Sequence, residues 1–134
     1  MSDHAIGNAK AWLGTITAAV AAMHALEQGV ESAEFDGETF TDYDDVRQRI
    51  DEMPLSVQVR TGWFAPGAKE DAEPEEFEIL LSTGGPALRV FGDIGGEPLL
   101  QWQDWGTPWT TYHDTTDEED EALRVFVGNF WLGE

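Results

Sequence analysis

Carboxylates are the side chains most able to carry function in this chain, which has 27 Asp and Glu residues but only seven Lys and Arg residues among its 134. The formal net charge is −20, far beyond the magnitude of about 2–8 that keeps a small domain soluble. A negative field of this size repels nucleic acid and anionic membranes and attracts basic partners. We therefore expect no direct binding to nucleic acid or to a membrane.

The acids are concentrated in three blocks of the sequence. Acidic block 1 (residues 31–52) holds nine of them, and acidic block 2 (residues 70–78) and acidic block 3 (residues 114–121) hold six each. Duplex DNA carries one charge per roughly 1.7 Å of its axis, so blocks that converge on one rigid face could imitate it. The residues predicted to contact a basic partner are Asp42, Asp44, Asp45, Glu73, Glu75, Glu76, Asp117, Glu118 and Asp120.

Three other interpretations of the acidity stay open. Adaptation to high salt would explain why only Lys10 and Lys69 are lysines, against five arginines. An ordinary acidic surface for solubility is the simplest alternative. Calcium binding is the weakest, because residues 42–52 (DYDDVRQRIDE) lack the glycine at the sixth position of a calcium loop and carry a helical apolar stripe instead.

The sequence shows no catalytic constellation. His4, His24 and His113 are far apart, and no zinc-binding spacing such as HExxH is present. Residues 82–85 (STGG) lack the lysine and the following helix of a phosphate loop, so they indicate a hairpin turn. Cysteine is absent, which excludes disulfides and thiolate metal sites. We expect a protein without enzymatic activity, cofactor or metal site.

Residues 100–112 (LQWQDWGTPWTTY) bring three tryptophans within eight positions. Strand alternation places Trp102 on the core side, whereas Trp105 and Trp109 lie where Gly106 and Pro108 interrupt the strand. Most of this cluster is expected to be scaffold, with Trp105 and Trp109 as the candidates for an exposed aromatic surface. The predicted core partners of Trp102 are Val57, Leu80 and Phe126.

Apolar residues at three- and four-residue spacing predict two helices in the first part of the chain. The first helix covers residues 3–28 and is capped by Gly29. A loop or frayed turn is expected over residues 31–40. The second helix covers residues 41–53, with Thr41 as its N-cap.

The period then changes to that of strands. Residues 55–64 predict a half-buried strand with Leu55, Val57 and Val59 on its inner face. A charged loop (residues 65–76), a hairpin (residues 76–94) and a strand that begins at Leu99 follow. A final helix is predicted after Thr115 or Thr116, either of which can act as its N-cap with a glutamate three residues later.

These elements predict a single α+β domain over residues 1–134. Two N-terminal helices precede a three- to four-stranded antiparallel meander, and the C-terminal helix packs on the sheet. The longest apolar stretch, residues 11–26, is too short and too weakly apolar to span a bilayer, and it lacks the features of a signal peptide. We expect a soluble, cytoplasmic protein. The sequence leaves its oligomeric state open.

Several segments resemble a group of small acidic proteins that phages, prophages and mobile elements carry. The similar segments of that group read LSTGGPA, QDWxTPWTxY and a closing aromatic-Gly-Glu. Here they are EEFEILLSTGGPALRV, LQWQDWGTPWTTY and FWLGE, together with the opening SDHAIGNAKAWL. The resemblance implies a mobile-element context and, for a phage-encoded protein, the host cytoplasm. Carriers of this kind commonly encode inhibitors of host defences such as CRISPR complexes and restriction enzymes, which is an analogy of context.

The hypothesis is a non-enzymatic accessory protein whose acidic surface binds a basic, nucleic-acid-handling host protein. Acting as a DNA mimic, it would inhibit a host defence as an anti-CRISPR or anti-restriction protein. The alternative is a structural or protein-interaction module that recognises its partner through exposed aromatic residues. Its acidity would then serve only solubility or salt adaptation.

Overall fold

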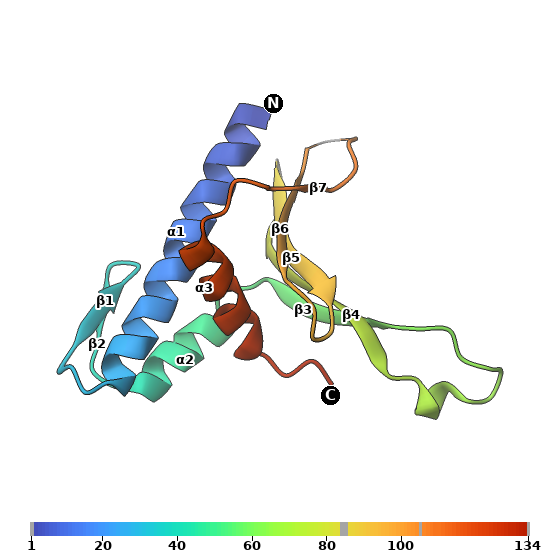
Figure 1. The fold of residues 1–134 in the computed structure, drawn as a ribbon, viewed down its shortest axis with the longest axis horizontal. Helices are drawn as coiled ribbons and strands as arrows, with labels where there is room; N and C mark the ends of the chain where they lie inside the picture. The colour runs from blue at the N-terminus through green and yellow to red at the C-terminus, as the bar shows by residue number, and fades with distance from the viewer. Residues whose placement is uncertain (1, 84–85, 105, 134) are drawn as a thin grey trace.

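The computed structural model describes residues 2–83, 86–104 and 106–133 of the chain. These residues form an α+β fold with three α-helices and two antiparallel sheets. The helices are α1 (Ser2–Glu27), α2 (Tyr43–Asp51) and α3 (Asp117–Gly128), and a short 3₁₀ helix covers Lys69–Asp71. The strands are β1 (Ala33–Phe35), β2 (Glu38–Phe40), β3 (Ser56–Thr61), β4 (Pro74–Ser82), β5 (Ala87–Asp93), β6 (Leu99–Gln103) and β7 (Thr110–Thr111). Figure 1 shows α1 and α3 on one side of the larger sheet, and the β1–β2 hairpin beyond α1.

The predicted first helix is confirmed. Its stripe of Ala9, Leu13 and Ile16 is at most 1% exposed, because these residues recur at the three- to four-residue spacing of one helical face. The C-terminal end is closed by Gly29 in the left-handed conformation, with φ of 99°. The Gly29 N–H donates to the Leu26 carbonyl at 3.1 Å, and the next N–H donates to the carbonyl of Ala25 at 3.2 Å. This is the Schellman pattern, so the predicted glycine cap is confirmed as well.

The prediction of a loop or frayed turn over residues 31–40 is wrong, because β1 and β2 form a hairpin there. Asp36 and Gly37 both have positive φ, 54° and 77°, which is the two-residue turn that suits the twist of paired strands. The rings of Phe35 and Phe40 stack with their centroids 5.1 Å apart and are buried. The Asp-Gly pair was the sequence signal for this hairpin, but strands of three residues are too short to show a clear alternation.

The second helix is present but shorter than predicted, and its N-cap is Asp42 instead of Thr41. The Asp42 Oδ1 accepts a hydrogen bond from the Asp44 N–H at 2.9 Å, as an N-cap side chain does. Val46 and Ile50 are fully buried and hold the helix against the core.

The larger sheet is an antiparallel meander in the order β3-β4-β5-β6-β7. It therefore has five strands, one more than the upper limit predicted, because the two-residue β7 pairs with β6 after the break in the tryptophan-rich segment. The core face carries Phe77, Ile79, Val90 and Leu100, all at most 2% exposed. The opposite face is not covered by a helix in Figure 1.

The first strand of the meander, β3, is exposed where the sequence predicted it to be half-buried. Leu55, Val57 and Val59 are 61%, 37% and 44% exposed. Val57 pairs with Ile79 and Val59 with Phe77, so these valines do lie on the core side of the sheet. They stay exposed because α1 packs near β6, towards the other edge of the sheet, and no helix extends over β3.

Trp102 packs against the core as predicted, but two of its three predicted partners are wrong. Leu80 pairs with an arginine on the opposite face of the sheet, and Val57 is on β3, separated from β6 by two strands. The cross-strand partner of Trp102 is Leu88, which is fully buried. Phe126 belongs to the same hydrophobic cluster as Trp102. Alternation within one strand gives the face of a residue, but it does not give the order of the strands.

The C-terminal helix confirms the cap predicted at Thr116. Thr116 Oγ1 accepts from the Glu119 N–H at 3.2 Å, and a Glu119 carboxylate oxygen accepts from the Thr116 N–H at 2.9 Å. This reciprocal capping box satisfies two N–H groups that the helix leaves without a partner. Leu123 and Phe126 are buried, at most 1% exposed.

Replacing Asp42 tests whether this residue, and not Thr41, is the N-cap of α2. We expect Asp42→Ala to lower the free energy of unfolding by about 1 kcal/mol, because the Asp44 N–H loses its acceptor. Asp42→Asn keeps a capping oxygen but removes the charge, so it should retain most of the stability. Thr41→Ala is the matched control and should change stability by less than about 0.5 kcal/mol. Urea denaturation measures all three, and a larger loss for Thr41→Ala would contradict the assignment.

Candidate functional site

Acidic block 1 lies in the β1–β2 hairpin and α2. Asp44 and Asp45 are exposed in the first turn of α2, where the helix dipole favours negative charge. Asp42 caps the helix and is exposed as well. The hairpin is tied to α2 by Arg49, whose Nη2 lies 2.5 Å from a carboxylate oxygen of Asp36. The carboxylates at the start of α2 are thus the part of block 1 presented on a rigid element.

Acidic block 2 lies in the loop between β3 and β4 and in the first half of β4. Glu73 and Glu75 are exposed. Glu76 is half-buried and accepts from Arg60 Nε at 2.6 Å, so its charge is balanced within the protein. Of the three residues predicted here as partner contacts, Glu73 and Glu75 present charge to solvent most freely.

Acidic block 3 forms the start of α3. Asp117 and Glu118 are exposed in its first turn. Asp120 is half-buried and accepts a hydrogen bond from the Thr115 hydroxyl at 2.6 Å, which gives it a structural role. Burial is the main cause that raises the pKa of the nearby Tyr112, and the charges of Asp114 and Glu119 raise it further.

The three blocks do not gather at one place. In Figure 1 the hairpin and α2 lie at one end of the longest axis, and the β3–β4 loop projects at the other end. The start of α3 lies between them. Block 1 and block 3 therefore belong to the helical side of the molecule, and block 2 is separate.

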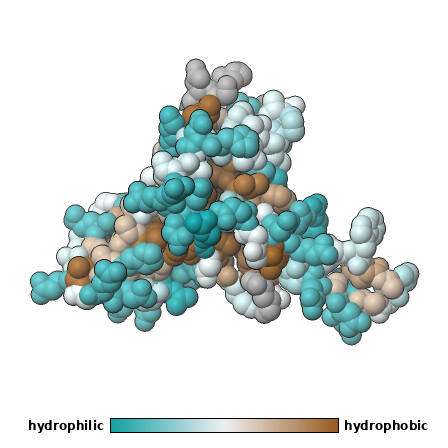
Figure 2. Space-filling view, in the orientation of Figure 1, coloured by the Kyte–Doolittle hydropathy of each residue, from teal (hydrophilic) through white to brown (hydrophobic). Residues whose placement is uncertain are grey.

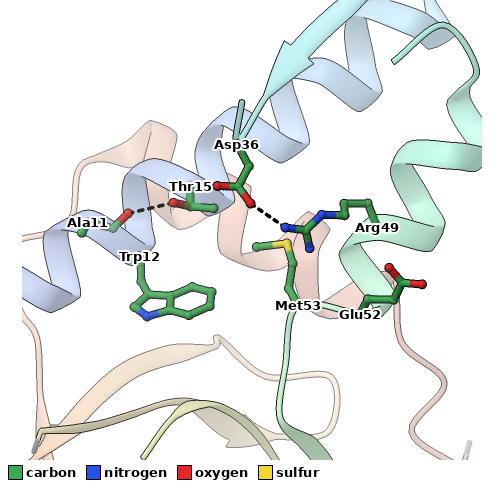
Figure 3. Close-up of a pocket in the computed structure, with 7 residues that line it drawn as sticks. All are labelled: Ala11, Trp12, Thr15, Asp36, Arg49, Glu52 and Met53. Carbon is green, nitrogen blue, oxygen red and sulfur yellow. Dashed lines mark hydrogen bonds and ion pairs between the residues drawn. The ribbon is translucent and has the colours of Figure 1, made fainter. Parts of the chain in front are cut away.

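A pocket of about 450 Å³ lies between α1, the hairpin turn and the end of α2 (Figure 3). Arg49 and Asp36 point toward each other across it, with Trp12 and Met53 below them in this view. The Thr15 hydroxyl donates to a carbonyl within α1, so it is already used. The remaining lining residues are Ala11 and Glu52.

This pocket combines an apolar wall with an ion pair at its opening. Arg49 also lies 3.6 Å from Glu38 and over the ring of Phe35, at 5.9 Å from its centroid. The guanidinium is thus committed to holding the hairpin, which leaves it little capacity to bind an anion. The sequence did not indicate this pocket, because no local pattern links Trp12 of the first helix with the hairpin.

On the open face of the sheet, Arg89 lies between two aromatic rings. Its guanidinium carbon is 4.1 Å from the centroid of Phe91 and 4.2 Å from that of Trp109. It donates to Glu78 at 2.6 Å and to Gln101 at 2.9 Å. Trp109, a predicted aromatic surface candidate, is half-buried in this stack and ties the segment before β7 to the sheet. Trp105, the other candidate, lies outside the described residues.

The most exposed aromatic residues are ones that the sequence did not single out. Trp63 is fully exposed, Phe64 is 45% exposed, and Trp131 is 83% exposed. Trp63 and Phe64 lie just after β3, beyond Gly62, and Trp131 lies in the segment after α3. An apolar residue next to a strand or helix is usually part of the core, so its local sequence gave no signal that it would be exposed.

The histidines form no site with the acids in the part of the chain that the structure describes. His4, His24 and His113 are exposed. Among the described residues, no group of three or more His, Asp or Glu side chains is arranged to hold a metal ion. The candidate binding features of the described residues are therefore the acidic surfaces, the exposed aromatic residues and the pocket.

Replacing Arg89 tests whether the open face of the sheet is held by this one side chain. We expect Arg89→Ala to lower the free energy of unfolding by about 2 kcal/mol, because two ring contacts and the hydrogen bonds to Glu78 and Gln101 are lost together. Arg60→Ala is the control, since Arg60 has a similar cross-strand ion pair but its side chain is 72% exposed. Arg60→Ala should lower the free energy of unfolding by less than about 1 kcal/mol. Equal losses in urea denaturation would show that the stack contributes nothing.

Comparisons with protein-family models, with curated proteins and with solved structures each returned no match. No helix of the described residues is long and apolar enough to cross a membrane.

Proposed function

We propose that this chain is a non-enzymatic binding protein whose acidic helix starts bind a basic, nucleic-acid-handling protein. The observation that carries the proposal is the net charge of −20 together with the positions of the few cations. Arg49, Arg60, Arg89 and Arg124 all form ion pairs with acids of the same chain. Most carboxylates thus remain uncompensated and attract a basic partner over a distance of several ångströms.

The start of α2 and the start of α3 supply the contact carboxylates in this proposal. Asp44, Asp45, Asp117 and Glu118 are exposed and sit on helices whose inner faces are packed in the core. A nucleic acid presents its phosphates on a stiff backbone, so rigidly held carboxylates imitate it better than carboxylates on a loop. Hydrophilic residues cover much of the face on which α2 and α3 lie (Figure 2).

The partner proposed is a host protein with a basic groove for nucleic acid. A CRISPR complex or a restriction enzyme fits this description, and the mobile-element context of the resembling proteins favours one of them. The protein would then occupy the groove as a DNA mimic and inhibit the defence. This proposal places the protein in the host cytoplasm.

A second candidate function is favoured by the exposure of Trp63 and Trp131. Exposed tryptophans are frequent anchors of protein interfaces. In this case the chain is an interaction or structural module, and its acidity serves solubility or salt adaptation. The first candidate predicts that added salt and charge reversal weaken binding, whereas the second predicts that they have little effect.

Charge reversal at the helix starts tests the first candidate. Tagged protein is used to capture partners from a host lysate, and the captured protein is then challenged with duplex DNA. We expect DNA to release it and the apparent affinity to fall as salt rises, because the contacts are electrostatic. Replacing Asp44, Asp45, Asp117 and Glu118 by lysine should weaken binding at least about tenfold, or 1.4 kcal/mol.

The matched control carries the same number of reversals outside these helix starts, at Glu27, Glu31, Glu70 and Asp93, all of which are exposed. It changes the net charge equally, so a specific contact surface predicts that it keeps most of the affinity. Binding that is insensitive to salt and to the helix-start reversals would reject the mimic. Loss of the same partner on Trp63→Ala or Trp131→Ala would then favour the second candidate.

A further inference from the structure

The outer edge of β3 has the features of a strand that receives another strand. It pairs with β4 on one side only, and in an edge strand the alternate N–H and C=O groups of the other side have no strand to bind. Leu55, Val57 and Val59 add an exposed apolar row along its core-side face. The opposite edge of the sheet, β7, has only two residues and offers no comparable surface.

Edge strands are usually protected against such pairing by lysine, proline or inward-pointing charge. β3 reads SVQVRT, so it has neither lysine nor proline. Its one charge, Arg60, is turned to Glu76 on β4 and is balanced there. The pairing of β3 with β4 has one register irregularity, between Arg60 and Thr61, so only the C-terminal end of the strand carries a feature that can blunt an edge. The rest of the strand is left open, which a protein under no demand for binding normally avoids.

The C-terminal end of β3 adds a place for a positive charge. A hollow of about 400 Å³ is lined by Trp63, Glu75 and the ion pair of Arg60 with Glu76. A second hollow of about 410 Å³ is lined by Trp63 and by the acids Glu75, Glu73 and Asp71. The carboxylate of Glu75 lies directly against Gly62, where even a Cβ atom would collide with it. An exposed indole beside carboxylates is the chemistry that recognises a lysine or arginine side chain.

We propose that the β3 edge binds an extended segment of a partner protein by strand addition. The segment alternates apolar and polar residues, so that its apolar side chains continue the row of Val57 and Val59. Antiparallel pairing brings the N-terminal end of the segment next to Trp63, where an arginine or lysine contacts the indole and Glu75. The ion pairs of the described residues leave Glu73 and Glu75 without a cation, so this end is complementary to a basic residue.

A second copy of this chain is the competing occupant, and the charges argue against it. Pairing β3 with β3 would bring two chains of net charge −20 together, and their acidic loops would lie near the same interface. The proposed surface is separate from the starts of α2 and α3, so its test is independent of the first candidate function; it shares only Trp63 with the second.

The test uses the intact protein and a synthetic peptide, acetyl-RTVTVTV-amide, in titrations at 0.15 M salt. A second peptide carries the arginine at its C-terminal end, and a third is N-methylated at alternate residues so that it keeps its charge but cannot extend the sheet. We expect the first peptide to bind at least about tenfold more tightly than the other two. Equal binding of the N-methylated peptide would overturn strand addition, and equal binding of the reversed peptide would overturn the assigned direction.

Variants of the protein locate the site. Trp63→Ala should lower the affinity for the first peptide about tenfold and Glu75→Gln about threefold, because each loses a contact with the arginine of the peptide. Both side chains are exposed and neither supports the core, so the variants should fold. The matched controls are Leu99→Ala, an exposed apolar residue on β6, and Glu27→Gln, an exposed acid of α1, and both should keep the affinity within about twofold. Unchanged binding in the Trp63 and Glu75 variants overturns the proposal. Sedimentation that shows a dimer abolished by Val57→Lys, with no peptide binding, assigns the edge to a second copy instead.

Discussion

The fold depends on the burial of one face of α1. This helix contacts α2, α3, β1 and β6, so it joins the hairpin, the other helices and the large sheet around a common core. Leu13 and Ile16 are at most 1% exposed within that core. Burial of apolar surface contributes roughly 25 cal/mol per Å², and here it must offset the mutual repulsion of a chain with 20 excess negative charges. The near absence of acids from α1 is consistent with that role.

Arginines add ion pairs and ring contacts that connect neighbouring elements at the surface of the fold. Arg49 joins the hairpin to α2, Arg89 holds the segment before β7 on the sheet, and Arg124 pairs with Glu97 in the turn between β5 and β6. The carboxylates of Glu121 and Glu97 raise the pKa of the Arg124 guanidinium, with the hydrogen bond to Glu121 as the main cause. Because so few cations are present and these serve structure, the acids at the helix starts and in the β3–β4 loop remain available to a partner. The two proposed surfaces are both consequences of this distribution.

Part of the candidate site could be predicted from the sequence. Acidic blocks are visible in composition, and the exposure of Asp44 and Asp117 follows from their place in the first turn of a capped helix. The separation of block 2 from the other blocks could not be predicted, because it depends on where the sheet packs against the helices. The different environments of two tryptophans could not be predicted either. Trp109 is enclosed by Arg89, whereas Trp63 is exposed at the end of an uncovered strand.

By itself, the sequence determined the elements whose signals are local. The spacing of apolar residues specifies α1 and α3, Gly29 and Thr116 end and begin them, and alternation with turn residues specifies the β4–β5 hairpin. The tertiary structure decided which faces of these elements are covered by another element and which are exposed. Val57 and Val59 have the pattern of buried strand residues, yet they are exposed because α1 packs near β6, towards the other edge of the sheet. Periodicity tells which side chains share a face, but burial depends on whether another element lies over that face, and that depends on contacts between distant parts of the chain.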